Sequence, residues 1–287
     1  MLPYLSKQDA ELRENVLHNF SILIILPCIL FLIVFGLIVV SDSTISILIA
    51  AALGAAVGMS GGSIGITTAH ELIHRQNKYM RGIGVLLLVL CCYGHFRIEH
   101  VYGHHKNVAT PIDPATGKRG ENIYRFVLRA IFKEHRDAWR IENSRLKLSK
   151  KNLLSPNNRM LVGYVRSSAI TIVAYFIGGF SGMGLFLIMS FVAKCFLELI
   201  NFAEHYGLVR EIGQPVGPRH SWNSNATLSS LYLFNVTRHS SHHEKSHLKY
   251  WELKSYPDSP FMPYGYLAML YLAIIAPPLF HRIMAKN

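Results

Sequence analysis

Four long apolar stretches dominate the chain, and each has close to the roughly 20 residues that an α-helix needs to cross a membrane. Ser41 to Thr44 separate the first two stretches, and an uncharged segment near 178–184 separates the last two. We therefore predict an all-α integral membrane protein with about four transmembrane helices in two hairpins. The predicted spans are 20–40, 45–68, 161–180 and 182–202.

Two further apolar stretches are too short or too interrupted to predict a crossing. The stretch 82–96 is short, and 264–280 contains Pro277 and Pro278 near its end. Both fit segments that enter the membrane partially. No glycine- or proline-rich linker and no repeat divides the chain, so 1–287 is predicted to be a single membrane-embedded domain.

The charges are distributed unevenly along this plan. Lys and Arg concentrate at the ends of the predicted helices that lie opposite the two short turns, for example at Lys7, Arg13, Arg75 and in the polar segment 97–159. Positive residues favour the cytoplasmic side of a membrane. We therefore expect the polar segments to form a cytoplasmic, histidine-rich cap, as in a protein of a bacterial inner membrane.

The composition supports the membrane prediction and argues against nucleic-acid binding. The chain is 51% hydrophobic and only 16% charged, compared with about 25% charged residues in soluble domains. Its net charge of +12 is explained by the loop distribution, and no zinc-finger or RNP pattern is present. The four cysteines all lie inside apolar stretches without metal-site spacing, so we interpret them as buried apolar residues.

Histidine is the residue type that indicates chemistry. Nine of the 15 histidines fall into four compact groups at the predicted cytoplasmic ends of the helices. We interpret the other six as ordinary solvated residues, although His95, His220 and His247 are weaker candidates for supporting the ligands. The nine are His70, His74, His100, His104, His105, His205, His239, His242 and His243.

Helical spacing explains how these residues could bind metal. Residues four apart lie above one another on a helix, so His70 and His74 can point at one metal, as can His100 and His104. The last group, 239–243, uses the i, i+3 and i+4 positions of one helical face. Helices that bring such side chains together form a metal site in the core of a bundle.

Nine imidazoles exceed the six ligands of one octahedral ion, so the sequence predicts two metals. Imidazole suits iron, copper, nickel and zinc, and the ligand type alone does not choose among them. Two iron ions with open positions would explain both the count and the membrane location. Glu71, Glu99 and Glu204 stand beside these histidines and could accept a ring N–H, bind metal directly or form ordinary ion pairs.

Two other functions fit the pattern less well. His70-Glu71-Leu72-Ile73-His74 matches the H-E-x-x-H pattern of zinc metalloproteases, but an intramembrane protease would leave seven grouped histidines without a role. A metal transporter would place ionisable residues within its spans, whereas here the histidines lie at the helix ends.

The residues resemble the membrane-bound alkane 1-monooxygenases and xylene monooxygenases, within the wider group that includes fatty acid desaturases. The resemblance rests on the segments 99–105, 108–114, 201–207, 222–225 and 238–243. It implies two non-haem iron ions bound by the nine histidines and O2 as co-substrate. It also implies electrons from a rubredoxin or ferredoxin with its reductase, with no catalytic side chain beyond the metal centre.

The implied reaction is hydroxylation of an unactivated C–H bond, such as a terminal methyl of an alkane or a benzylic methyl, to an alcohol. A fatty acyl desaturase or hydroxylase is the alternative. The hydrophobic substrate would enter from the lipid bilayer between the two hairpins. Small residues between Gly54 and Gly65 could leave room for it, or could serve tight helix packing. A basic surface could bind the electron carrier; it comprises Lys118, Arg119, Lys147, Lys150 and Lys151.

Overall fold

The computed structural model describes residues 7–286, with side chains from residue 15 onward. The side chains of Lys7 and Arg13, which entered the charge argument, lie outside this part. Within the described residues the fold is helical, as predicted, and the β-bridge between Asn223 and Phe261 is isolated. The longer helices are α1 (Lys7–Leu23), α2 (Ile25–Val40), α3 (Ile47–Ser60), α5 (Lys78–Leu90), α8 (Ile123–Leu148), α9 (Arg159–His205) and α12 (Tyr266–Ile275).

Short helices connect these elements and carry most of the grouped histidines. Two of them, η1 and η2, are π-helices and η3 is a 3₁₀-helix. The short elements are η1 (Gly61–Ile66), α4 (Thr67–Ile73), α6 (Phe96–Glu99), η2 (His100–His104), α7 (His105–Asn107), η3 (Pro218–His220), α10 (Thr227–Tyr232), α11 (His239–Glu244) and α13 (Pro277–Met284).

Three continuous helical segments are long and apolar enough to cross a membrane: Asn15–Val40, Ile47–Ile73 and Arg159–His205. The third is broken at Gly178 and Gly179, where Gly179 has a φ of 59°, a conformation that glycine adopts without strain. It therefore consists of two arms joined by a sharp turn. The four predicted spans in two hairpins are confirmed, and the protein is an integral membrane protein.

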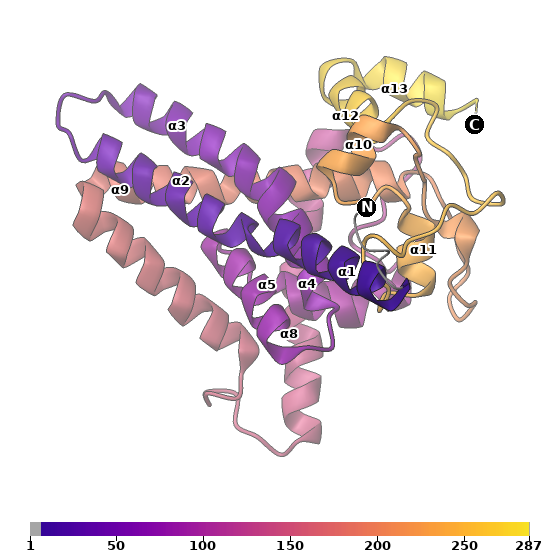
Figure 1. Ribbon diagram of the computed structural model, residues 1–287, viewed down its shortest axis with the longest axis horizontal. Coiled ribbons are helices and arrows are strands. Elements are labelled where there is room, and N and C mark those ends of the chain that lie inside the picture. The colour runs from indigo at the N-terminus through magenta and orange to yellow at the C-terminus, as the bar shows by residue number, and fades with distance from the viewer. Residues whose placement is uncertain (1–6, 287) are drawn as a thin grey trace, which may run out of the picture.

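Both hairpin turns lie at the same end of the molecule, on the left of Figure 1. A Cβ at Gly178 would lie 3.2 Å from the carbonyl oxygen of Leu37, so the turn of α9 packs against the end of α2. The ends of α4 and α9 that lie away from these turns lead towards α11 and the other histidine-bearing helices (Figure 1). The spans therefore place all the histidine groups on one side.

Glycines hold α3 and η1 against the second arm of α9. A Cβ at Gly54, Gly58 or Gly62 would lie 2.6–2.8 Å from the carbonyl oxygen of Leu185, Met189 or Ala193, respectively. These glycines recur every four residues on one helical face, so they permit close backbone contact. Of the two alternatives for the small residues, the structure shows tight packing rather than space for a substrate.

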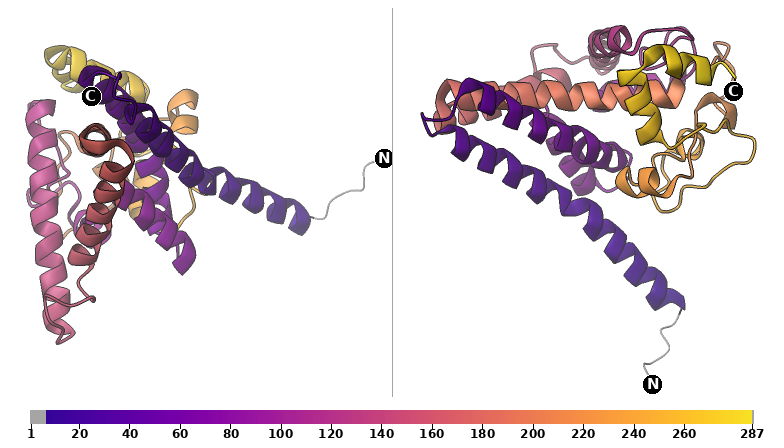
Figure 2. Two further views of the ribbon diagram at one scale, coloured as in Figure 1. Left: turned by 90° about the vertical axis from the view of Figure 1, so that its left-hand side faces the viewer. Right: turned by 90° about the horizontal axis from the view of Figure 1, so that it is seen from above.

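The two weaker apolar stretches form short helices. Helix α5 has 13 residues and α12 has 10, about 20 Å and 15 Å at 1.5 Å per residue, too short to cross. The N-terminal rod formed by α1 and α2 diverges from α3 (Figure 2), and its His18 ring hydrogen-bonds Tyr250 at 2.9 Å. This contact ties the first span to the histidine-bearing end.

The sequence analysis treated 97–159 only as a long polar segment, but the structure contains the 26-residue helix α8 there. One face of α8 is buried against α9 and α6, including Phe126, Ala130 and Ala138. Glu142 lies on this face and pairs with Arg145 and Arg159 at 2.7 and 2.6 Å. Helix α8 is therefore an amphipathic support that packs against the base of α9.

Candidate metal centre

Four parts of the fold deliver the nine grouped histidines to one place. The span that ends in α4 supplies His70 and His74, and α9 ends at His205. The η2–α7 segment supplies the histidines at 100, 104 and 105, and α11 supplies those at 239, 242 and 243. Their side-chain nitrogens form two groups, in each of which the candidate ligand atoms lie within 4.8 Å of one another. The first group is His70, His74, His100, His105 and His242, and the second is His104, His205, His239 and His243.

The grouping corrects one interpretation of the sequence. The sequence spacing allowed His100 and His104 to point at one metal, but they belong to different groups, whereas His100 and His105 share one. The cause is the π-helical turn η2, in which the N–H of His105 donates to the carbonyl oxygen of His100. A π-helix hydrogen-bonds residues five apart rather than four, and such turns are frequent at functional sites.

Helix α11 divides its histidines in the same way. His239 and His243, four residues apart, belong to the second group, and His242 belongs to the first. The i, i+3 and i+4 positions of α11 therefore supply histidines to both groups.

The geometry within each group fits metal ligation. The Nε2 atom of His105 lies 3.0 Å from that of His100 and 3.1 Å from that of His242. Likewise, Nε2 of His239 lies 3.1 Å from His205 and 3.0 Å from His243. A neutral ring nitrogen has either one hydrogen or one lone pair, so it cannot hydrogen-bond fully to two such neighbours.

The nitrogen separations also indicate the coordination geometry. Two nitrogens about 2.1 Å from one metal lie about 3.0 Å apart at 90° and about 3.4 Å apart at tetrahedral angles. The observed 3.0–3.1 Å fits ligands at right angles. In addition, Nε2 of His104 is buried without a hydrogen-bond partner among the described residues. The short separations and the unpartnered Nε2 of His104 therefore fit two sets of metal donors.

Burial keeps these imidazoles neutral, as metal ligands must be. It lowers the pKa of His74 to about 3, with a further contribution from the neighbouring His104. Burial, followed by repulsion from neighbouring imidazoles, also lowers the pKa of His100, His239 and His242 well below the ordinary value. At neutral pH their ring lone pairs are thus available.

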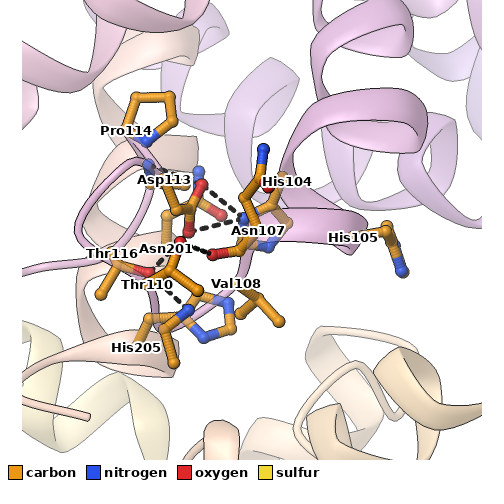
Figure 3. A network of polar contacts seen from close by, with 12 residues as sticks. His104, His105, Asn107, Val108, Thr110, Asp113, Pro114, Thr116, Asn201 and His205 are labelled. Atoms are coloured by element: carbon orange, nitrogen blue, oxygen red, sulfur yellow. Dashed lines mark hydrogen bonds and ion pairs between the residues drawn. The ribbon is translucent and has the colours of Figure 1, made fainter. Parts of the chain in front are cut away.

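Outer hydrogen bonds orient the second group. The Nδ1 of His104 lies 3.1 and 3.2 Å from the two carboxylate oxygens of Asp113, and Thr116 donates to the same carboxylate at 2.5 Å (Figure 3). The Nδ1 of His205 donates to the carbonyl oxygen of His220 at 3.3 Å. With Nδ1 bound in this way, Nε2 of each ring faces the cluster. In Figure 3, the His105 side chain lies apart from the contacts of His104, and His105 belongs to the first group.

The three glutamates singled out from the sequence differ in their surroundings. Glu204 lies 3.2 Å from Nδ1 of His239. Glu71 instead pairs with Arg75 at 2.7 Å and accepts from the backbone N–H of Tyr250 at 3.3 Å, which matches the ion-pair alternative. Glu99 is buried with one oxygen unpaired among the described residues, and burial raises its pKa well above the ordinary value.

Sequence reasoning missed Asp113 as a site residue, although it quoted 108–114 as a segment of resemblance. The fully buried Asp113 and Thr116 follow the η2 histidines within a compact turn. A carboxylate within 12 residues of a histidine group, between two prolines, was the available signal. Its contact with His104 could not be derived without the fold.

Comparisons with known proteins agree with this site. A family model described as fatty acid desaturase matches residues 43–273. Alkane 1-monooxygenase 1 of Pseudomonas aeruginosa is 40% identical over 78% of this chain and 59% of its own length. Alkane 1-monooxygenase of Acinetobacter baylyi is 38% identical over 82% and 58%. The xylene/toluene monooxygenase hydroxylase component of Pseudomonas putida is 31% identical over 77% and 59%. The chain spans about three fifths of the length of these relatives.

Proposed function

The chain belongs to the fatty acid desaturase family, and on that premise we propose that it is a membrane-bound di-iron monooxygenase. It would hydroxylate an unactivated C–H bond of a hydrophobic substrate to an alcohol, as the names of its relatives suggest. The observation that supports this most directly is the convergence of nine histidines into two groups at one end of the apolar spans. We propose the whole of 1–287 as one membrane-embedded domain.

The five-histidine group would hold one iron ion and the four-histidine group the other. When bound, the irons would supply O2 activation and C–H oxidation, the chemistry that side chains lack. Asp113 would accept the Nδ1 hydrogen of His104, which fixes the tautomer and orientation of that ring, and Glu204 lies 3.2 Å from Nδ1 of His239.

A small apolar cavity lies on the membrane side of the histidines and is the proposed substrate site. Its volume is about 130 Å³, and Met59, Phe196, Leu199 and Leu270 contribute to its lining. Leu199 precedes His205 by six residues of α9, about 9 Å along the helix axis. A hydrophobic chain in this cavity would be shielded from water and directed at the histidine groups.

Tyr232 and Ser63 close the polar side of this cavity through a 2.8 Å hydrogen bond. Leu199→Trp would fill the space, so the enzyme should accept only shorter chains. Product profiles over a series of n-alkanes would test this prediction. A loss of all chain lengths in equal proportion would contradict the assignment of the cavity.

The electron donor is proposed to be a rubredoxin or ferredoxin that binds near Arg119. Arg119 and Arg219 line a cavity of about 380 Å³ together with Tyr206 and Trp222, next to His205. Lys147, Lys150 and Lys151 instead lie at the far end of α8, which points away from α11 (Figure 1). The basic surface expected from the sequence is thus divided, and only its Arg119 part lies beside the metal centre. Because positive residues favour the cytoplasmic side of a membrane, the side that carries the histidine groups would face the cytoplasm, with the spans in a bacterial inner membrane.

The decisive test uses iron-loaded protein in lipid nanodiscs with octane, reduced rubredoxin and ¹⁸O2. The expected product is octanol with one ¹⁸O atom, formed by the wild type and by His247→Ala, since His247 is exposed and outside both groups. His242→Ala should abolish the product. An alkene as sole product, or acyl-chain desaturation without octanol, would favour the desaturase alternative. Zinc-dependent peptide cleavage in place of oxidation would favour the protease.

A further inference from the structure

An arginine-lined cavity lies at the start of α9, and none of the nine grouped histidines contributes to its lining. It has a volume of about 210 Å³ and is lined by Arg97, Arg159 and Arg166 together with apolar residues such as Val85 and Val162. None of its lining residues is acidic. The cavity therefore combines a cationic rim with an apolar floor.

The positive charge around this cavity is not balanced by the protein. Arg159 pairs with Glu142 at 2.6 Å, but the same carboxylate also pairs with Arg145 at 2.7 Å. Among the described residues, no carboxylate lies within ion-pair distance of Arg97 or Arg166. Glu142 thus pairs with two guanidinium groups, and the other two, on Arg97 and Arg166, have no such partner in the part of the chain that the structure describes.

Arg97 is half-buried in this cationic environment. Burial lowers its pKa, and Arg159 and Arg81 lower it further. A desolvated cation beside other cations is stabilised by an anionic ligand. The electrostatics of the cavity therefore favour an anion at its rim.

A second, larger cavity adjoins the first. Its volume is about 520 Å³, it shares Gly94 and Gly163 with the arginine-lined cavity, and its surface is mainly apolar. Thr171 and Ile172 of the first arm of α9 line it, and so does Leu187 of the second arm. The two cavities together match a ligand with an anionic head and a hydrocarbon tail.

The position along the helix indicates where this ligand comes from. Arg159 is the first residue of α9, and Arg166 lies two turns further into the span, about 10 Å along the axis. Lipid headgroups occupy this depth, and a long arginine side chain reaches back towards them. A soluble acidic protein would match the charge but would leave the apolar cavity between the arms unexplained.

We propose that the cavity lined by Arg97, Arg159 and Arg166 binds the phosphate headgroup of an anionic phospholipid, with one acyl chain in the adjoining cavity between the arms of α9. The site is separate from the histidine groups and does not depend on the proposed reaction. It would fix the base of α9, which pairs with α8 through Glu142.

The test is native mass spectrometry of the detergent-solubilised full chain, titrated with phosphatidylglycerol or with phosphatidylcholine of identical acyl chains. The wild type should bind phosphatidylglycerol more tightly. Arg97→Gln/Arg166→Gln should weaken that binding about 30-fold, since each arginine near a lipid surface contributes about 5-fold. Arg125→Gln/Arg136→Gln is the matched control, because these arginines are exposed on α8 and outside the cavity, and it should bind as the wild type does.

Gly163→Val is an independent variant for the hydrocarbon part. A Cβ at Gly163 meets no heavy atom within 4 Å, so the Gly163→Val protein should fold normally. The added side chain should reduce the space where the two cavities adjoin. Its expected effect is weaker phosphatidylglycerol binding at an unchanged melting temperature. Equal binding of the two lipids, equal weakening by both double variants, or displacement by inorganic phosphate at lipid-like concentrations would overturn the proposal. The proposal would also be overturned if Arg97→Gln/Arg166→Gln lost binding of the electron carrier but bound phosphatidylglycerol as the wild type does. Iron content, measured in parallel, reports separately on the proposed function.

Discussion

Replacing Asp113 with asparagine should weaken one metal site and spare the other. Asp113 accepts from His104, Thr116 and the backbone N–H of Ala115, and only 4% of its surface is exposed. Burial raises its pKa, but the interactions with His104 and Thr116 outweigh burial, so the net pKa is lowered and the carboxylate is ionised at neutral pH.

The magnitude follows from these contacts. The asparagine side chain would keep the shape of the aspartate but lose its charge, and the amide N–H₂ would face a donor, either the His104 ring or the Thr116 hydroxyl. Loss of such an outer partner typically lowers metal affinity about 10- to 100-fold, or about 1.4 to 2.7 kcal/mol. The effect should be confined to the group that contains His104.

The assay is Fe(II) titration of metal-free protein against a chelator of known affinity. Asp113→Asn should show one site of wild-type affinity and one weakened site. Asp137→Asn is the control, because Asp137 is partly exposed and pairs with Arg140 on α8. Two sites of unchanged affinity in Asp113→Asn, or equal weakening of both, would refute the role of Asp113.

Two further predictions concern stability. Gly58→Ala should lower the melting temperature, because its Cβ would lie 2.6 Å from the Met189 carbonyl oxygen. A Cβ at Gly184 would lie in open space, so Gly184→Ala should raise stability by up to about 1 kcal/mol through helix propensity. A change of the same sign in both variants would contradict the packing of Gly58 against α9. The metal-free protein should lose stability as pH falls below about 6.5, because the unfolded histidines then bind protons that the folded ones, such as His74 with a pKa of about 3, do not. Each strongly shifted histidine contributes up to about 1.4 kcal/mol per pH unit. Denaturant midpoints at pH 7.5 and 5.5 would measure this loss, and equal midpoints would count against it.

The sequence predicted the elements whose signal is local. The length of the apolar stretches predicted the spans. Gly178 and Gly179, where α9 is broken, lie in the predicted second turn. Helical spacing gathered the nine histidines. The buried face of α8 was also readable, since Ile123, Phe126, Ala130 and Ala138 recur at helical intervals, but the many charges of this segment obscured it.

What the sequence could not supply depends on tertiary contacts. The division of histidines between two groups requires the π-helical hydrogen bond from His105 to His100, and no spacing rule distinguishes that turn from an α-helix. The role of Asp113 depends on a loop that returns to His104. Whether the glycines near Gly58 serve packing or a substrate depends on how closely α9 approaches.

The most direct test of two metal sites compares the adjacent histidines His242 and His243. They belong to different groups, so iron analysis and Mössbauer spectroscopy should give two irons per wild-type chain and a different remaining iron in His242→Ala than in His243→Ala. One metal per wild-type chain, or the same residual spectrum in both variants, would contradict the two-site account.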